Sequence, residues 1–143
     1  MRFRTEIESI KACFELGHAD KMVLLGSCFT DEVGSRLAAD GFDVCANPFR
    51  ALYNPMSICR CIDRILSGEA YSEADLTSGP RGYHCLDYAT RYSGADIAAL
   101  LGVLNDDASR LRESLCAGPT VFLTFGTAYV YRLREDGRLV GNC

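Results

Sequence analysis

The sequence predicts an α/β fold with an open, mainly parallel sheet and flanking helices, of the flavodoxin-like kind. Three observations carry this prediction. Strand-like and helix-like segments alternate along the chain, which is the pattern of such sheets. Residues 120–125 form a continuous apolar run, typical of a parallel strand covered on both faces. A second apolar run, residues 22–25, ends in a Gly26-Ser27 turn that leads into helix-forming sequence.

The elements can be placed in order from periodicity and from start and stop signals. Acidic residues at 31 and 32 and a following Gly41 bound the first helix. Asn54 and Pro55 begin the second helix, and Gly68 ends it. Residues 69–91 are irregular. The expected elements are a strand over 22–25, a helix over 31–40, a strand over 42–46, a helix over 55–67, a long helix from 93 to 118, a strand over 120–125 and a hairpin over 128–134 and 138–140.

Two of the expected helices carry an apolar face. In the second helix this face comprises Ile58, Ile62, Ile65 and Leu66. In the long helix, which Ser93 and Asp96 would open as a capping box, the face comprises Ile97, Leu100, Leu101, Leu104, Ala108, Leu111 and Leu115. We expect the long helix to pack with this face on the sheet that contains Val121 and Leu123.

Length and composition restrict the class of protein. The chain has 143 residues, 48% of them hydrophobic, which suits one domain with one core. Its net charge of −4, without a Lys/Arg cluster, argues against a nucleic acid partner. Residues 1–6 lack the apolar stretch of a signal peptide, and no apolar run is long enough to span a membrane. We therefore expect a cytoplasmic protein without a membrane partner.

The chain contains 8 cysteines, but their spacing does not indicate a disulfide framework or a zinc site. No Cys-x-x-Cys pair occurs, and a helix would point Cys59 and Cys61 to opposite sides. We expect free, buried thiols in a reducing compartment and no metal or other cofactor.

Ser27 is the leading candidate for a reactive side chain. A serine on a tight strand-to-helix turn has its oxygen exposed above the strand ends, beside the unpaired N–H groups of the first helical turn. The alternative is a plain connection in which Ser27 caps the next helix.

Several motifs, in order along the chain, resemble the GSCFA family of bacterial proteins. They are Gly26-Ser27-Cys28-Phe29-Thr30, Asn47-Pro48-Phe49, Leu52-Tyr53-Asn54-Pro55-Met56-Ser57-Ile58, Phe125-Gly126-Thr127-Ala128-Tyr129 and Gly141-Asn142-Cys143. The family is similar to the SGNH (GDSL-type) hydrolases, in which the first motif carries the serine nucleophile. Two departures stand out: Thr30 where the family name has Ala, and Arg50 where Gly is more usual.

The resemblance implies a set of site residues at the carboxyl ends of the strands. It implies Ser27 as nucleophile, and its own and the Cys28 N–H groups as oxyanion donors. Further donor or binding candidates are Asn47, Asn54, Gly126 and Thr127. Each donor aimed at a developing oxyanion contributes roughly 3 kcal/mol. Asn47 and Asn54 could instead serve as turn and cap residues, and Gly126 could be needed only for a positive φ.

The catalytic base is harder to place. The only histidines are His18 and His84, and the Asp-x-x-His motif of SGNH enzymes is absent. His18 precedes the nucleophile strand; His84, in the irregular stretch, is a weak candidate. GSCFA-like sequences usually have His after the Asn-Cys pair, where this chain stops at Cys143. We therefore expect residues 1–143 to be the N-terminal portion of a single GSCFA/SGNH-like domain, nearly inactive alone.

The function that follows is a serine-dependent ester hydrolase or acyltransferase acting on small or carbohydrate-linked acyl groups. The expected partner is a small-molecule or glycan ester substrate. The alternative is a catalytically silent SGNH-like module that binds a glycan or peptide. If the sheet lacks later elements, we also expect the chain to self-associate through uncovered apolar surface.

Overall fold

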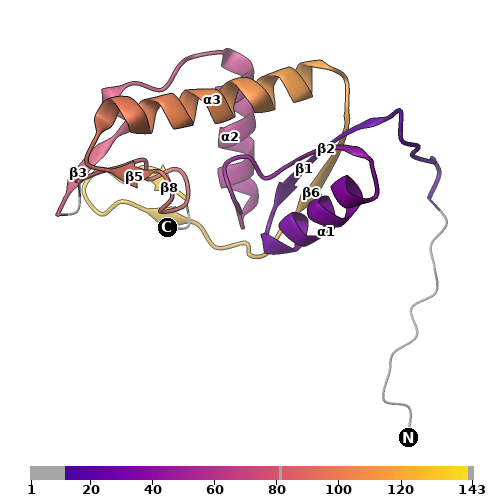
Figure 1. Cartoon of the computed structure of the whole chain (residues 1–143). Helices are drawn as coiled ribbons and strands as arrows, with labels where there is room; N and C mark the ends of the chain where they lie inside the picture. The colour runs from indigo at the N-terminus through magenta and orange to yellow at the C-terminus, as the bar shows by residue number, and fades with distance from the viewer. Residues whose placement is uncertain (1–11, 81, 142–143) are drawn as a thin grey trace, which may run out of the picture.

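The computed structural model describes residues 12–80 and 82–141, and Figure 1 shows their arrangement. The elements, in chain order, are β1 (Lys21–Gly26), α1 (Cys28–Ala39), β2 (Asp43–Ala46), α2 (Pro55–Ser67), a 3-10 turn η1 (Glu73–Asp75), β3 (Thr77–Gly79), β4 (Gly82–His84), β5 (Ser93–Gly94), α3 (Ile97–Cys116), β6 (Thr120–Thr124), β7 (Tyr131–Arg132) and β8 (Leu139–Val140). The family motif at 141–143 therefore ends in two residues outside the described ranges.

A parallel three-stranded sheet with the order β2-β1-β6 forms the centre of the molecule. Val23 of β1 lies opposite Cys45 of β2 on one side and Val121 of β6 on the other. Helix α1 and helix α3 lie on opposite sides of this sheet (Figure 1). The predicted α/β class, with a mainly parallel sheet and flanking helices, is confirmed.

The core lies between β1, α2 and α3. Strand β1 is buried from Met22 to Gly26, and its Val23 and Leu25 join the main apolar cluster. The helices add Ile58, Cys61 and Ile65 from α2 and Leu100, Leu104 and Leu111 from α3. The face predicted for the long helix is confirmed for these three leucines.

Helix α2 begins and ends where the sequence indicates. The Asn54 side chain accepts a hydrogen bond from the Ser57 amide at 2.8 Å, Pro55 is the first helical residue, and Gly68 adopts a left-handed φ of 74°. One predicted core position is wrong: Leu66 is 50% exposed, and Cys61 is buried in the core instead.

Two helix starts differ from prediction. Helix α1 begins at Cys28, three residues before the predicted start, because Ser27 rather than a later residue takes the N-cap position. Helix α3 begins at Ile97: Asp96 is its N-cap and accepts from the Ala99 amide at 3.1 Å, whereas Ser93 belongs to β5. The long helix is therefore shorter at its start, and Ser93 forms no capping box with Asp96.

Strand β6 is an edge strand rather than a strand covered on both faces. Val121 is 42% exposed and Leu123 is 43% exposed, although their partners Val23 and Leu25 in β1 are buried. Helix α3 packs over β1 and does not cover these two side chains. The apolar run therefore predicted the strand correctly, but it did not predict that one face of the strand is exposed to solvent.

The stretch that was unreadable in the sequence forms a second, antiparallel sheet with the order β3-β4-β5. Tyr83 of β4 packs against the core cluster, which contains four aromatic rings: Phe49 stacks on Tyr88 with centroids 4.1 Å apart, and Tyr71 and Tyr92 complete the group. The predicted terminal hairpin is confirmed in shorter form as β7 and β8.

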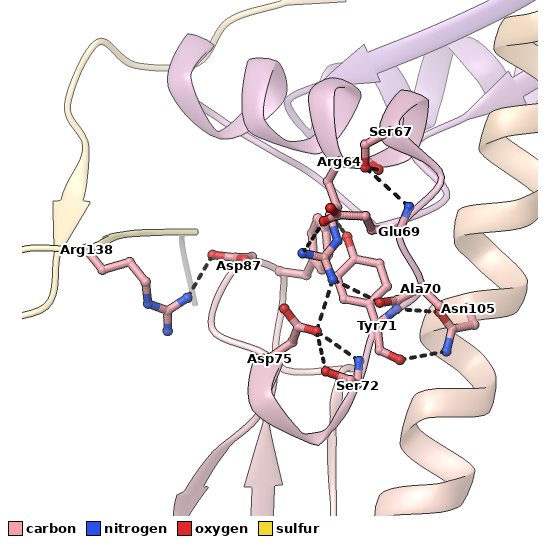
Figure 2. A network of polar contacts seen from close by, with 11 residues as sticks. Arg64, Ser67, Glu69, Ala70, Tyr71, Ser72, Asp75, Asp87, Asn105 and Arg138 are labelled. Atoms are coloured by element: carbon pink, nitrogen blue, oxygen red, sulfur yellow. Dashed lines mark hydrogen bonds and ion pairs between the residues drawn. The ribbon is translucent and has the colours of Figure 1, made fainter.

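A network of polar contacts attaches the segment after α2 to α2 itself and to α3 (Figure 2). Arg64 of α2 pairs with Glu69 at 3.5 Å and with Asp75 at 3.0 Å. Asn105 of α3 holds the backbone of Tyr71 through both its amide oxygen and its amide nitrogen. These groups bond mainly to one another, so the network is structural.

The cysteines are free thiols throughout the described ranges, but only two of them are buried. Cys61 and Cys85 lie in the core, Cys45 is partly buried, and the remainder of the described set is exposed. The expectation that the cysteines act mainly as buried small hydrophobes is therefore wrong for most of them. Among the helices described, none is long and apolar enough to cross a bilayer.

Candidate active site

The turn between β1 and α1 requires glycine at position 26. Gly26 has a φ of 147°, and a Cβ atom there would lie 2.0 Å from the carbonyl oxygen of Thr124. No side chain fits such a contact. The close approach of β1 and β6 at their carboxyl ends therefore sets the path of the chain into Ser27.

Ser27 occupies the N-cap position of α1, yet its hydroxyl does not cap the helix. The Ser27 Oγ atom lies 3.2 Å from Thr124 Oγ1, and the Ser27 amide donates to the same Thr124 oxygen at 3.0 Å. Thr30, buried one turn into α1, lies 2.6 Å from Thr124 Oγ1 through its own hydroxyl. Three hydroxyl groups thus form a chain below the turn, and the capping alternative does not describe Ser27.

Asn47 fastens the turn from the side of β2. Its side-chain oxygen accepts from the Gly26 amide at 2.8 Å, and its side-chain nitrogen donates to the Ser27 carbonyl at 3.2 Å and to Asp31 at 2.9 Å. Asn47 is only 4% exposed and has a left-handed φ of 39°. Asparagine tolerates that backbone conformation better than most residues, so this residue is both a turn former and a clamp on Ser27.

Gly126 lies directly beside Ser27. A Cβ atom at Gly126 would lie 2.9 Å from the Tyr53 ring and 3.5 Å from the Ser27 Cβ. Gly126 is not among the residues with positive φ, so the alternative role suggested for it is wrong. The glycine is needed for close packing against Tyr53, whose carbonyl accepts from the Gly126 amide at 2.8 Å and from the Thr127 amide at 3.1 Å.

The side chains of Cys28 and Tyr53 lie within hydrogen-bonding reach of each other. Burial raises the pKa of the Tyr53 hydroxyl, and the neighbouring Cys28 and Asp31 raise it further. The phenol is therefore neutral over the physiological range and able to donate a hydrogen bond. Cys28 itself is exposed, and its backbone amide, in the first turn of α1, has no intrahelical acceptor.

The sequence-predicted residues fall into three groups. Ser27, Cys28, Asn47, Gly126 and Thr127 meet at one edge of the sheet, where β1, β2 and β6 end. The donor groups of most of these bond within the protein. Of this set, the Cys28 amide is the donor for which the described residues supply no acceptor. Their role at an oxyanion stays a prediction.

Asn54 stands apart from this group. Its side-chain nitrogen donates to the Ser57 hydroxyl at 3.0 Å, in addition to the cap bond already described. Two residues before Asn54, the Leu52 amide donates to the Gly26 carbonyl at 2.8 Å. This bond joins the backbone before α2 to the turn between β1 and α1. Asn54 therefore caps and orients α2, and the backbone before it reaches the site.

Neither histidine lies at this edge. His18 stacks on Phe42 at 4.2 Å and lies within 3.0 Å of the Asp40 carbonyl, before the start of β1, whereas Ser27 follows its end. A strand of six residues separates the two by roughly 20 Å. His84 is on β4, in the antiparallel sheet that Figure 1 shows at the far end of the molecule from α1.

Sequence reasoning missed three residues of the site: Thr124, Tyr53 and Asp31. Thr124 belongs to an apolar run in the sequence, although a polar residue at the carboxyl end of a strand is a signal that could mark it. Tyr53 holds Gly126 and Thr127 through its carbonyl, which no side-chain pattern reveals. Asp31 shows in the sequence only the pattern of an acidic residue in a first helical turn.

Comparison with known protein families identifies the family of this chain. The model of the GSCFA family matches residues 21–143, which includes every element of the site, and the protein belongs to this family. No curated protein and no solved structure matches the chain significantly.

Proposed function

We propose that this protein is a serine-dependent ester hydrolase or acyltransferase of the SGNH type, acting on small or carbohydrate-linked acyl groups, with Ser27 as the nucleophile. The observation that carries the proposal is that the Ser27 hydroxyl makes no capping hydrogen bond. Ser27 is the N-cap residue of α1, but its side chain does not accept from the helix amides. Gly26, Asn47 and Thr124 hold the turn around it instead.

The chemistry follows from the arrangement. The Ser27 oxygen attacks the carbonyl carbon of an ester, and the alkoxide of the leaving group departs with the serine proton. The negative charge of the tetrahedral intermediate is stabilised by the Cys28 amide at the positive end of α1. Water, or a second alcohol in the transferase case, then releases the acyl group and regenerates Ser27.

The general base comes, in this proposal, from outside the described residues. Within residues 12–80 and 82–141 the Ser27 hydroxyl has only another hydroxyl, that of Thr124, as its hydrogen-bond partner. A hydroxyl cannot accept the serine proton at neutral pH, and in this proposal an imidazole that approaches Ser27 takes it.

Steady-state hydrolysis tests the proposal. We would express the protein from its complete reading frame and compare wild type, Ser27→Ala and Ser109→Ala on p-nitrophenyl acetate. Ser109 is an exposed serine on α3, so its variant is the matched control. Loss of a nucleophile lowers kcat by about 10⁶-fold. Equal turnover by Ser27→Ala and wild type would contradict the proposal.

The alternative is a catalytically silent binding module for a glycan or peptide. The absence of a histidine contact to Ser27 among the described residues favours this alternative. An inactive protein that binds oligosaccharides, with Ser27→Ala binding equally well, would select it.

The expected cellular location and the expected self-association are also proposals. The free thiols of the described cysteines support a cytoplasmic location. The exposed Val121, Leu123 and Phe125 of the β6 edge support self-association of this chain with a second copy. Light scattering over a concentration series measures the latter; a constant monomer mass would contradict it.

A further inference from the structure

We propose that the hollow beside Ser27 binds a carboxylate, with Arg50 as its main contact, so that the substrate carries a negative charge a short distance from its ester. The assignment of this carboxylate to a substrate rests on the proposed function. The binding of a carboxylate does not, and it can be measured separately.

The hollow lies at the carboxyl edge of the parallel sheet, between α1 and α3. It has a volume of about 280 Å³, and its charged walls are Arg50, Arg91, Arg110, Asp31 and Asp107, with Asn47 at its base. Three guanidinium groups thus face two carboxylates, which leaves the hollow with a positive balance.

The acidic groups of the hollow are already engaged by the protein. Asp107 is 5% exposed; it lies 3.8 Å from Arg91 and 3.6 Å from Arg110. The Tyr92 hydroxyl is also hydrogen-bonded to it at 2.8 Å. Asp31 accepts from the Asn47 side chain. Two arginines therefore share one buried carboxylate with a tyrosine.

Of the three arginines in the hollow, Arg50 is the one without an acidic partner among the described residues. It is exposed at the rim of the hollow, and its amide donates to the carbonyl of Asn47, the clamp on Ser27 three residues earlier, at 2.8 Å. Its φ of 65° is a conformation that glycine adopts freely. A guanidinium here offers a fork that matches a carboxylate in a bidentate pair.

The distance between the hollow and Ser27 limits the ligand. Asp31 is four residues after Ser27 on α1, and Asn47 bonds to both residues. The Asp31 wall of the hollow therefore lies roughly one helical turn, about 5.4 Å along the helix axis, from Ser27. An acyl group of the succinyl or glutaryl kind, with its second carboxylate two or three carbons from the ester, spans such a distance.

Succinate is the probe for the binding test. We would follow the chemical shifts of ¹⁵N-labelled protein during a titration with sodium succinate at constant ionic strength. The variant is Arg50→Gly, which removes the guanidinium and suits the local φ; the matched control is Arg36→Ala, which removes an exposed arginine from the last turn of α1. We expect saturable shifts at Asn47 and Asp31, and a dissociation constant raised roughly tenfold or more by Arg50→Gly but not by Arg36→Ala.

Three results would overturn the proposal: no saturable shifts in the wild type, an unchanged dissociation constant in Arg50→Gly, or equal weakening in both variants. In active protein, the ratio of kcat/KM for mono-p-nitrophenyl succinate to that for p-nitrophenyl acetate should fall roughly tenfold in Arg50→Gly. Activity without succinate binding would refute this inference alone, and succinate binding without any role for Ser27 would refute the proposed function alone.

Discussion

Substituting Gly26 by alanine should destabilise the protein far more than a glycine-to-alanine change elsewhere. The new Cβ would lie 2.0 Å from the Thr124 carbonyl oxygen, whereas real Cβ contacts stay above 3.0 Å. The strands must therefore separate by about 1 Å at this point, which breaks the bonds from the Ser27 amide to Thr124. Each lost bond costs about 1 kcal/mol, and the positive φ adds about 1–2 kcal/mol. We expect a total of about 3–4 kcal/mol.

Gly102 supplies the matched control. It lies within α3, exposed, and nothing lies within 4 Å of a Cβ placed there. Alanine at this position should stabilise the protein by about 0.5–1 kcal/mol, because it removes backbone freedom from the unfolded chain. Urea unfolding followed by far-UV circular dichroism gives both free energies. A Gly26→Ala variant within about 1 kcal/mol of wild type would refute the described packing of β1 on β6.

Other substitutions and conditions test the packing of the domain. Leu104→Ala removes a fully buried leucine from α3 and should cost about 2–5 kcal/mol in urea unfolding, whereas Val103→Ala, at a 40% exposed side chain, should cost under about 1 kcal/mol. Asn54→Ala removes the cap of α2 and should lower stability by about 1–2 kcal/mol, measurable as a lower melting temperature. Burial raises the pKa of Cys61 to about 12 and that of Cys85 to about 11, both from 9.0. The unfolded thiols therefore ionise first as pH rises above 9, so the urea midpoint should fall between pH 8 and pH 10.5; an unchanged midpoint would contradict their burial.

Much of the fold could be predicted because local signals and tertiary structure agree. Helix α2 shows this best: an asparagine cap, a proline in the first position and a glycine end marked its limits. The failures arose where tertiary contacts decide. The short strands β3, β4 and β5 carry no periodicity, and Tyr83 of β4 packs against the core cluster through contacts that the sequence does not reveal. Likewise Val121 and Leu123 look like core residues, but none of the described elements covers them.

The site could be predicted only in part, for a similar reason. Ser27 and Asn47 were recognisable because each follows a strand at the carboxyl edge of the sheet. The hydroxyl chain through Thr124 was not, because the approach of β6 to Gly26 creates it, and the two residues lie far apart in sequence. In the structure, most of the predicted donors form hydrogen bonds that hold the turn itself. These internal hydrogen bonds are tertiary contacts, so the sequence alone could not reveal them.

The reaction of Ser27 with a fluorophosphonate probe tests the central claim most directly. The protein expressed from its complete reading frame would be labelled, digested and mapped by peptide mass spectrometry, beside Ser27→Ala and Cys28→Ser variants. Our account predicts one adduct, on Ser27, which disappears in Ser27→Ala and persists in Cys28→Ser. An adduct on Cys28, or labelling that survives Ser27→Ala, would contradict it.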